Sequence, residues 1–166
     1  TGGNVSLYNE SPAGAIDPTP TVGMVGLVES EKHITTQFFQ QAGDAILLVG
    51  EPGSELGASH YLLAAHDRKE GVPPKLDYDR ELAVQNAVRS LIRMGLVQSA
   101  HDSAEGGLAV ALAESCMTGP RVLGANVAIA SAESRADVVL FNESQSRIVL
   151  SVKKANAAAV LALLAW

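Results

Sequence analysis

Ala100-His-Asp-Ser-Ala-Glu-Gly-Gly-Leu-Ala-Val-Ala-Leu112 is the stretch that decides how the surrounding chain folds. A short apolar run, Leu96-Val97, leads into it, and three polar groups follow at His101, Asp102 and Glu105. The pair Gly106-Gly107 comes next, before an apolar segment of helical character. This order predicts a strand that ends in polar side chains, turns at glycine and opens a helix.

Such a turn is a recurrent way to hold an anion, because the first N–H groups of a helix are free and carry partial positive charge. Glycine also lets the backbone approach a ligand closely. Asp102 and Glu105 would repel a bare phosphate unless a divalent cation lay between them. The stretch therefore predicts a loop for a magnesium-bound nucleotide or another polar ligand. The alternative, which shape alone favours, is a plain strand–turn–helix with Ser103 as the N-cap.

Towards the C-terminus the pattern predicts a helix over 108–117, stopped by Gly119-Pro120, and strands over 126–130, 137–141 and 147–152. The last two strands flank Asn142-Glu-Ser-Gln-Ser146, a polar loop of hairpin length. Its side chains could simply be solvated, which is the commoner case, or could form a cradle for a polar ligand. A helix over 155–166 follows.

Towards the N-terminus we expect a buried strand over 22–28, a second strand over 45–49, and helices over 56–66 and 78–94. Asp77 or Asp79 can cap the second helix, and Gly95 can end it. Its apolar stripe follows helical spacing and comprises Val84, Ala87, Val88, Leu91 and Ile92. Residues 1–20 are rich in turn formers and are interpreted as the tail of a preceding domain plus a linker. Residues 21–166 then form one α+β domain of mixed α/β layers, a sheet covered by helices.

Composition limits the function classes. The 166 residues are 47% hydrophobic, and 18 acidic against 12 basic residues give a formal net charge of −6. Without a local Lys/Arg cluster this argues against a nucleic-acid or anionic-membrane surface. No apolar run is long enough to cross a bilayer, and the lone Cys116 suits a reducing, cytoplasmic compartment. The chain opens on Thr1 and stops in mid-helix, so we expect a piece of a longer protein.

Three stretches in this order and spacing resemble the phosphoribosylformylglycinamidine synthase family, which is related to aminoimidazole ribonucleotide synthetase. They are Thr1-Gly-Gly-Asn-Val-Ser-Leu-Tyr-Asn-Glu10, Ser99-Ala-His-Asp-Ser-Ala-Glu-Gly-Gly-Leu-Ala-Val-Ala-Leu112 and Asn142-Glu-Ser-Gln-Ser-Arg147. The likeness continues between them, through Pro18-Thr-Pro-Thr-Val-Gly-Met-Val-Gly-Leu27 and Gly71-Val-Pro-Pro74.

The resemblance implies an ATP- and Mg²⁺-dependent ligase of purine biosynthesis. In that family, ATP phosphorylates the amide oxygen of formylglycinamide ribonucleotide, and glutamine-derived ammonia then displaces phosphate. Phosphorylation turns a poor leaving group into a good one, and Mg²⁺ screens the phosphates. The synthetase is an internal duplication, so this chain corresponds to the C-terminal portion and lacks the first half. The implied partners are that half, a glutaminase and a small accessory subunit. An alternative is a non-catalytic scaffold that packs the synthetase and docks the glutaminase. A related thiamine-phosphate or selenophosphate-type kinase is disfavoured, because its acidic metal cluster is absent near the start.

Carried over residue by residue, the resemblance places Gly3 against ATP, Asn4 on Mg²⁺ and Ser6 on the substrate. The family's catalytic histidine belongs to the absent half, so we assign no catalytic residue. Without the resemblance, the segment would be interpreted as a Gly/Asn turn with no ligand.

The other two motifs are expected to form an auxiliary nucleotide site with a structural or regulatory role. Its residues would be His101, Asp102, Glu105, Gly106, Gly107, Glu143, Ser144 and Gln145. The family usually has serine where this chain has Ala104, with Ser103 one place earlier. A hydroxyl contact to phosphate would therefore be lost or shifted.

Overall fold

The computed structural model describes residues 2–4, 10–17, 20–130 and 135–165. The chain divides into two compact units, Thr1–Glu31 and Lys32–Trp166. Each unit is described by itself.

The described residues of the first unit form two short antiparallel pairs of strands. Strand β1 (Gly2–Asn4) pairs with β4 (Thr21–Gly23), and β2 (Glu10–Ser11) pairs with β3 (Gly14–Ala15). The predicted buried strand over 22–28 is wrong in length and in burial. Only Thr21–Gly23 is strand, and Val25 and Leu27 are 92% and 97% exposed. The sheets among the described residues of this unit are two-stranded, and no second layer in that part covers such side chains.

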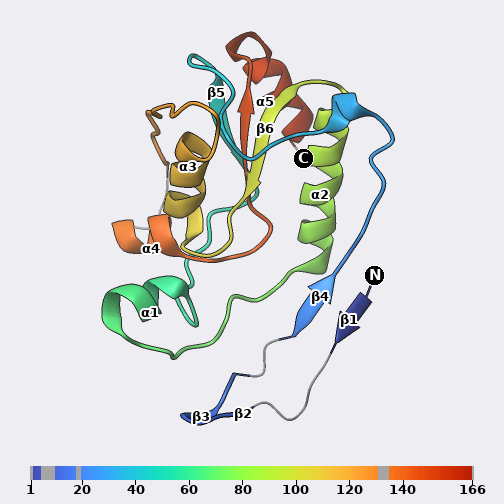
Figure 1. Cartoon of the computed structure of the whole chain (residues 1–166). Helices are drawn as coiled ribbons and strands as arrows, with labels where there is room; N and C mark the ends of the chain where they lie inside the picture. The colour runs from blue at the N-terminus through green and yellow to red at the C-terminus, as the bar shows by residue number, and fades with distance from the viewer. Residues whose placement is uncertain (1, 5–9, 18–19, 131–134, 166) are drawn as a thin grey trace. The chain divides into compact units, whose positions relative to one another are not determined.

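A three-stranded antiparallel sheet organises the second unit (Figure 1). Its order is β5 (Ala45–Val49), β7 (Ile148–Val152) and β6 (Val97–Asp102). The central strand β7 is almost entirely buried, and its side chains alternate between the two faces. Leu150 and Val152 enter one hydrophobic cluster, whereas Val149 enters another.

Helices α2 (Tyr78–Arg93) and α5 (Ala157–Leu164) cover the first face (Figure 1). A 3₁₀ turn, η2 (Lys154–Asn156), precedes α5. The predicted stripe of α2 is confirmed at Val84, Val88 and Leu91, which are buried. The predicted ends are confirmed too, since the Asp77 side chain accepts the Arg80 N–H at 3.0 Å and Gly95 has φ +69°.

Helix α3 (Gly107–Met117) covers the other face, where Leu108 and Ala111 pack with Phe39 and Val149. The segment before β5 contains the 3₁₀ helix η1 (Glu31–His33), and Thr36 bridges to Ser99 of β6. Helix α1 (His60–His66) is shorter than the predicted helix over 56–66. It begins where the Ser59 hydroxyl accepts the Leu62 N–H at 3.3 Å.

One predicted strand is a helix. Residues 137–141 belong to α4 (Ala136–Phe141), although a run of β-branched residues favoured a strand. Tertiary packing overrides that propensity. The helical turn buries Val138 and, one turn later on the same face, Asn142. Loop 142–146 therefore joins a helix to a strand, and the predicted hairpin is wrong. Residues 126–130 form no strand either.

The α+β class, a sheet covered by helices, is confirmed. Among the residues described, none of the helices is both long enough and apolar enough to span a bilayer.

Candidate functional site

Two of the predicted motifs meet at the ends of neighbouring strands. The 103–106 turn leaves β6, and loop 142–146 enters β7. Asp102 lies opposite Ile148 in the sheet, and the Ser103 N–H donates to the Arg147 carbonyl at 2.9 Å. The ladder thus continues one step beyond β6 and brings together segments about forty residues apart in sequence.

A hollow of about 360 Å³ lies at this meeting point. Three predicted residues line it: Asp102, Glu143 and Gln145. The rest of its lining comprises Leu76, Glu81, Val84, Ser103, Ala104, Ser146, Arg147 and Ile148. A hollow of about 380 Å³ beside Phe39 and Asp44 contains none of the predicted residues. We call the 360 Å³ hollow the motif pocket.

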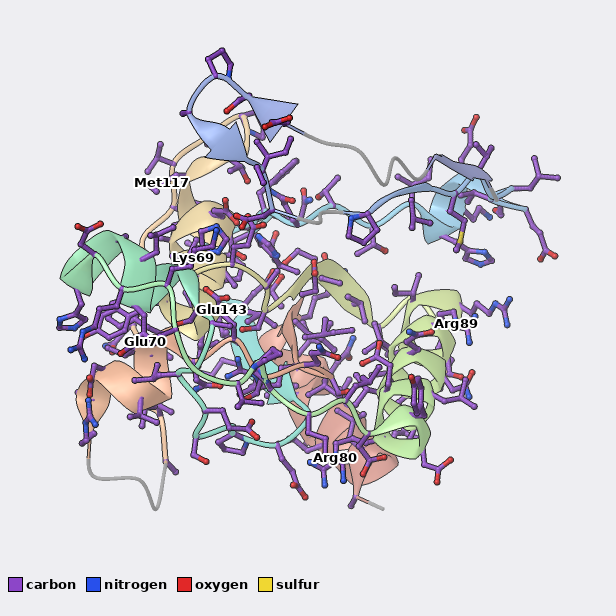
Figure 2. The ribbon with its side chains drawn as sticks, turned by 90° about the horizontal axis from the view of Figure 1, so that it is seen from below. Lys69, Glu70, Arg80, Arg89, Met117 and Glu143 are labelled. Carbon is purple, nitrogen blue, oxygen red and sulfur yellow. The ribbon has the colours of Figure 1, made fainter. Side chains whose placement is uncertain are left out.

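Glu143 connects two helix beginnings rather than pointing freely into the motif pocket. Its Oε1 accepts the Gly106 N–H of the α3 N-cap and the His60 N–H of the first α1 residue, both at 2.8 Å. The carboxylate is largely covered, because only 15% of the Glu143 side chain is exposed. Glu143 is labelled in Figure 2. The protein's own carboxylate therefore occupies the place where the glycine turn was expected to hold an anion.

The glycine turn owes its shape to both glycines. Gly106 and Gly107 have φ of +76° and +66°, the left-handed region that residues with a Cβ rarely adopt. A Cβ on Gly107 would lie 2.4 Å from the Asn142 carbonyl oxygen, so α3 begins in tight contact with the end of α4. The alternative with Ser103 as N-cap is wrong, because the N-cap is Gly106 and no side chain caps it.

Other predicted residues lie near the motif pocket but outside its lining. The Ser144 hydroxyl is turned to Glu55, with Oγ donating to Oε2 at 3.1 Å. His101 Nε2 lies 2.9 Å from Glu114 Oε2 of α3, and its side chain is only 10% exposed. Glu105 is exposed on the turn. His101 and Ser144 thus make internal contacts in this structure.

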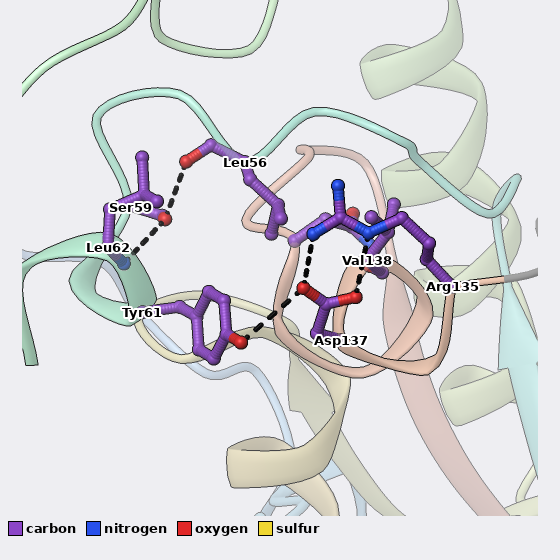
Figure 3. Close-up of polar contacts among 8 residues, drawn as sticks. Leu56, Ser59, Tyr61, Leu62, Arg135, Asp137 and Val138 are labelled. Atoms are coloured by element: carbon purple, nitrogen blue, oxygen red, sulfur yellow. Dashed lines mark hydrogen bonds and ion pairs between the residues drawn. The ribbon is translucent and has the colours of Figure 1, made fainter. Parts of the chain in front are cut away.

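A contact between α1 and α4 holds the His60 end of this network (Figure 3). The Tyr61 ring stacks on Phe141 with centroids 4.9 Å apart, and its hydroxyl reaches Asp137 Oδ2 at 3.4 Å. Arg135 pairs with the same carboxylate and holds the pKa of Asp137 below its usual value. The start of α1 is thereby held beside the loop that carries Glu143.

The sequence did not identify Arg147 and Glu81 as part of this site, and it included Ser146 only in the alternative of a polar cradle over loop 142–146. Ser146 Oγ donates to Glu81 Oε2 at 2.6 Å, and this bond, followed by one from Gln85, lowers the pKa of Glu81. A charged residue directly before the core strand β7 was the available signal for Arg147. Nothing in the helical pattern of α2 could show that Glu81 faces loop 142–146.

The described residues contain no cluster of three or more His, Cys, Asp or Glu side chains placed to hold a metal. Magnesium in nucleotide sites is commonly held by one or two carboxylates together with phosphate oxygens and water. Asp102 lines the motif pocket, and 80% of its side chain is exposed, so its carboxylate oxygens are accessible to a metal ion.

The first predicted motif lies in the other unit. Gly3 is exposed and pairs with Val22, and Asn4 pairs with Thr21. Ser6 lies outside the described residues.

Comparison with known proteins identifies the family. Residues 41–165 match the family described as AIR synthase related protein, C-terminal domain. The chain belongs to this family. The AIR synthase related C-terminal domain thus spans most of the second unit, and the resemblance read from the three motifs is confirmed.

Two relatives are the phosphoribosylformylglycinamidine synthase subunits PurL of Anaeromyxobacter sp. strain K and Anaeromyxobacter dehalogenans strain 2CP-1. Each is 52% identical over 164 residues, which cover 94% of this chain and 22% of the relative. The chain thus spans about a fifth of the length of these relatives.

Solved structures show the same fold at low identity. Thermotoga maritima PurL complexed with FGAR gives a TM-score of 0.62 at 19% identity, covering 81% of this chain and 24% of that one. The complex with ADP has a TM-score of 0.59 at 18% identity, covering 81% of this chain and 21% of that one. PurLQS from the same organism has a TM-score of 0.57 at 18% identity, covering 80% of this chain and 21% of that one.

Proposed function

We propose that this chain supplies the C-terminal-type domain of a synthetase that makes formylglycinamidine ribonucleotide from formylglycinamide ribonucleotide, ATP and glutamine-derived ammonia. The observation that carries the proposal is 52% identity to two PurL subunits across 94% of the chain. The reacting groups are shared with the rest of the synthetase. We therefore expect this chain to have no turnover by itself.

In the first unit, Gly3 would approach ATP, Asn4 would offer its amide oxygen to Mg²⁺, and Ser6 would bind the substrate. Gly3 is exposed, as a ligand contact requires. In the full synthetase, Asn4→Ala should reduce kcat at least tenfold and raise the Mg²⁺ concentration needed for activity. Asn126→Ala, at an exposed asparagine outside the three motifs, is the control. Equal activity of both variants would remove Asn4 from the metal site.

The motif pocket would serve as an auxiliary site for a magnesium-bound nucleotide, with a structural or regulatory task. Its support is the meeting of the predicted residues Asp102, Glu143 and Gln145 around one hollow. The contacts of Glu143 assign it to holding α1 and α3 in place, whereas Asp102 is exposed and available to a metal.

Isothermal titration calorimetry of the chain with ADP, with and without MgCl₂, tests this auxiliary site. We expect one site per chain that requires Mg²⁺, and Asp102→Asn should weaken it. Asp79→Asn, at the exposed start of α2, is the control. Absence of heat with Mg²⁺ and ADP, or equal binding by Asp102→Asn, would contradict the assignment.

A glutaminase and a small accessory subunit are the proposed partners, in line with the assembly named in the PurLQS structure of Thermotoga maritima. The scaffold alternative predicts that kcat survives Asn4→Ala and that only glutaminase docking depends on this chain. Cytoplasmic location stays a prediction from the lone Cys116, which is unpaired and half-buried.

A further inference from the structure

A further hollow, of about 270 Å³, is lined by strand β5, helix α3 and residues 127–130. We call it the α3-face hollow. Arg147 supplies the only polar side chain among the described residues that line it. The rest of the lining is apolar or glycine: Ile46, Leu47, Leu48, Gly50, Pro52, Leu108, Leu112, Val127, Ala128, Ile129, Ala130, Val139 and Val149. One cation therefore stands in a surface that is otherwise hydrocarbon.

The alternation of strand β7 turns the Arg147 side chain towards this hollow. Ile148 and Leu150 pack in the hydrophobic cluster under α2 and α5, whereas Val149 packs in the cluster under α3. Arg147 lies two residues before Val149, so its side chain shares the α3 face of the sheet. The motif pocket, which Arg147 also borders, contains Val84 and Ile148 of the opposite face. The guanidinium thus belongs to the α3-face hollow.

Arg147 is a buried cation with unused donors. It is 2% exposed, and its Nε and one terminal nitrogen donate to the carbonyls of Ser144 and Asn142 at 2.8 and 2.6 Å. A guanidinium has more N–H groups than these two bonds use. Among the described residues no carboxylate lies within 4.0 Å of it. The two carbonyls supply partial negative charge but no counter-ion.

A buried charge without a counter-ion is costly, because it has lost its hydration. Burial accordingly lowers the pKa of Arg147. The contrast with three other arginines is clear, since Arg68, Arg80 and Arg135 are exposed and each pairs with a carboxylate. The arginine with the greatest need of an anion is thus the one that finds none in the described part of the chain.

The chemistry of the lining selects the kind of anion. A guanidinium fork matches the two oxygens of a carboxylate. A phosphate would place its remaining oxygens against apolar side chains that offer no donor. A hydrocarbon tail, in contrast, gains by leaving water there. The size also suits a small molecule, because a cavity of roughly 150 Å³ already admits benzene.

We propose that the α3-face hollow binds a small monocarboxylate with a hydrocarbon tail. Its carboxylate accepts hydrogen bonds from the unused N–H groups of Arg147, and its tail lies against Leu112 and Val139. The site is separate from the motif pocket and from the proposed synthetase activity.

Hexanoate, hexan-1-ol and acetate are the probes, titrated into the chain at constant ionic strength and followed by ligand-observed NMR. We expect hexanoate to bind about tenfold more tightly than hexan-1-ol, because only the carboxylate forms charge-assisted hydrogen bonds. Acetate should bind at least about tenfold more weakly than hexanoate, because it lacks the tail. Hexanoate should also raise Tm in a concentration-dependent way. Equal affinity for hexanoate and hexan-1-ol, or no binding at millimolar concentrations, would overturn the proposal.

Two variants locate the ligand. Arg147→Leu removes the guanidinium and should abolish the preference for hexanoate over hexan-1-ol, a ratio that does not depend on the stability of the variant. If Arg147→Leu does not fold, Val139→Phe decides, because it fills the hollow without changing the guanidinium and should weaken hexanoate about tenfold. Val122→Phe, at a valine that is 75% exposed and outside the lining, is the matched control and should leave Kd unchanged.

Unchanged hexanoate affinity in a folded Val139→Phe chain would place the ligand elsewhere and refute the proposal. None of these measurements involves synthesis of formylglycinamidine ribonucleotide, so their failure would leave the proposed function standing.

Discussion

Gly107→Ala tests how tightly α3 is seated against the end of α4. Alanine in the left-handed region costs roughly 1–2 kcal/mol, and the stiffer unfolded chain offsets about 0.4–1 kcal/mol of that. At Gly107 the new Cβ would also lie 2.4 Å from the Asn142 carbonyl oxygen and 2.9 Å from that of Leu140. Both are backbone atoms, so the overpacking adds about 1–3 kcal/mol. We therefore expect Gly107→Ala to lower the free energy of unfolding by about 2–4 kcal/mol.

Comparison with Gly95→Ala separates the cost of the backbone contact at Gly107 from the cost of the left-handed conformation. Gly95 has nearly the same φ, +69°, but a Cβ there would have no atom within 4 Å. We expect it to cost about 1 kcal/mol or less. Urea unfolding followed by circular dichroism gives both values, provided that the m-value is unchanged. Equal destabilisation by the two variants, within about 0.5 kcal/mol, would refute the tight seating of α3.

The contacts around the motif pocket lead to two further predictions. Glu143→Gln should lower the free energy of unfolding by about 1–3 kcal/mol, because charge-assisted bonds to two backbone N–H groups become neutral ones; Glu105→Gln, on the exposed turn, should stay within about 0.5 kcal/mol. An equal effect of the two would dismiss the bridging role of Glu143. The second change concerns pH: the pKa of Glu81 is lowered in the folded chain by Ser146 and then Gln85. The stability from this shift is present above the ordinary carboxyl pKa and is lost as pH falls through the lowered one. Ser146→Ala should therefore flatten the acid side of a stability–pH curve, and an unaltered slope would contradict the contact.

The local signals were sufficient wherever one segment decides its own structure. The stripe of α2, its cap at Asp77 and its stop at Gly95 follow from helical period and backbone stereochemistry, and the structure has all three. Strand β6 and helix α3 were expected around the two glycines for the same reason. The family resemblance also needed only the order and spacing of three motifs.

The errors arose where packing between distant segments decides. A β-branched run became α4 because Val138 is buried there, and the apolar run after Thr21 stayed exposed. No periodicity links Glu143 to the starts of α1 and α3, nor Glu81 to Ser146. These contacts exist because β6 and β7 pair and bring two turns together.

The sequence by itself determined the class of fold, the family and the two polar motifs, since each depends on residue types at short spacing. Only the tertiary structure decided which polar groups are used internally and which remain for a ligand. The physical reason is that a carboxylate or guanidinium has one chemistry but many candidate partners. Its role depends on which of them lies within hydrogen-bond distance, and chain folding alone sets that distance.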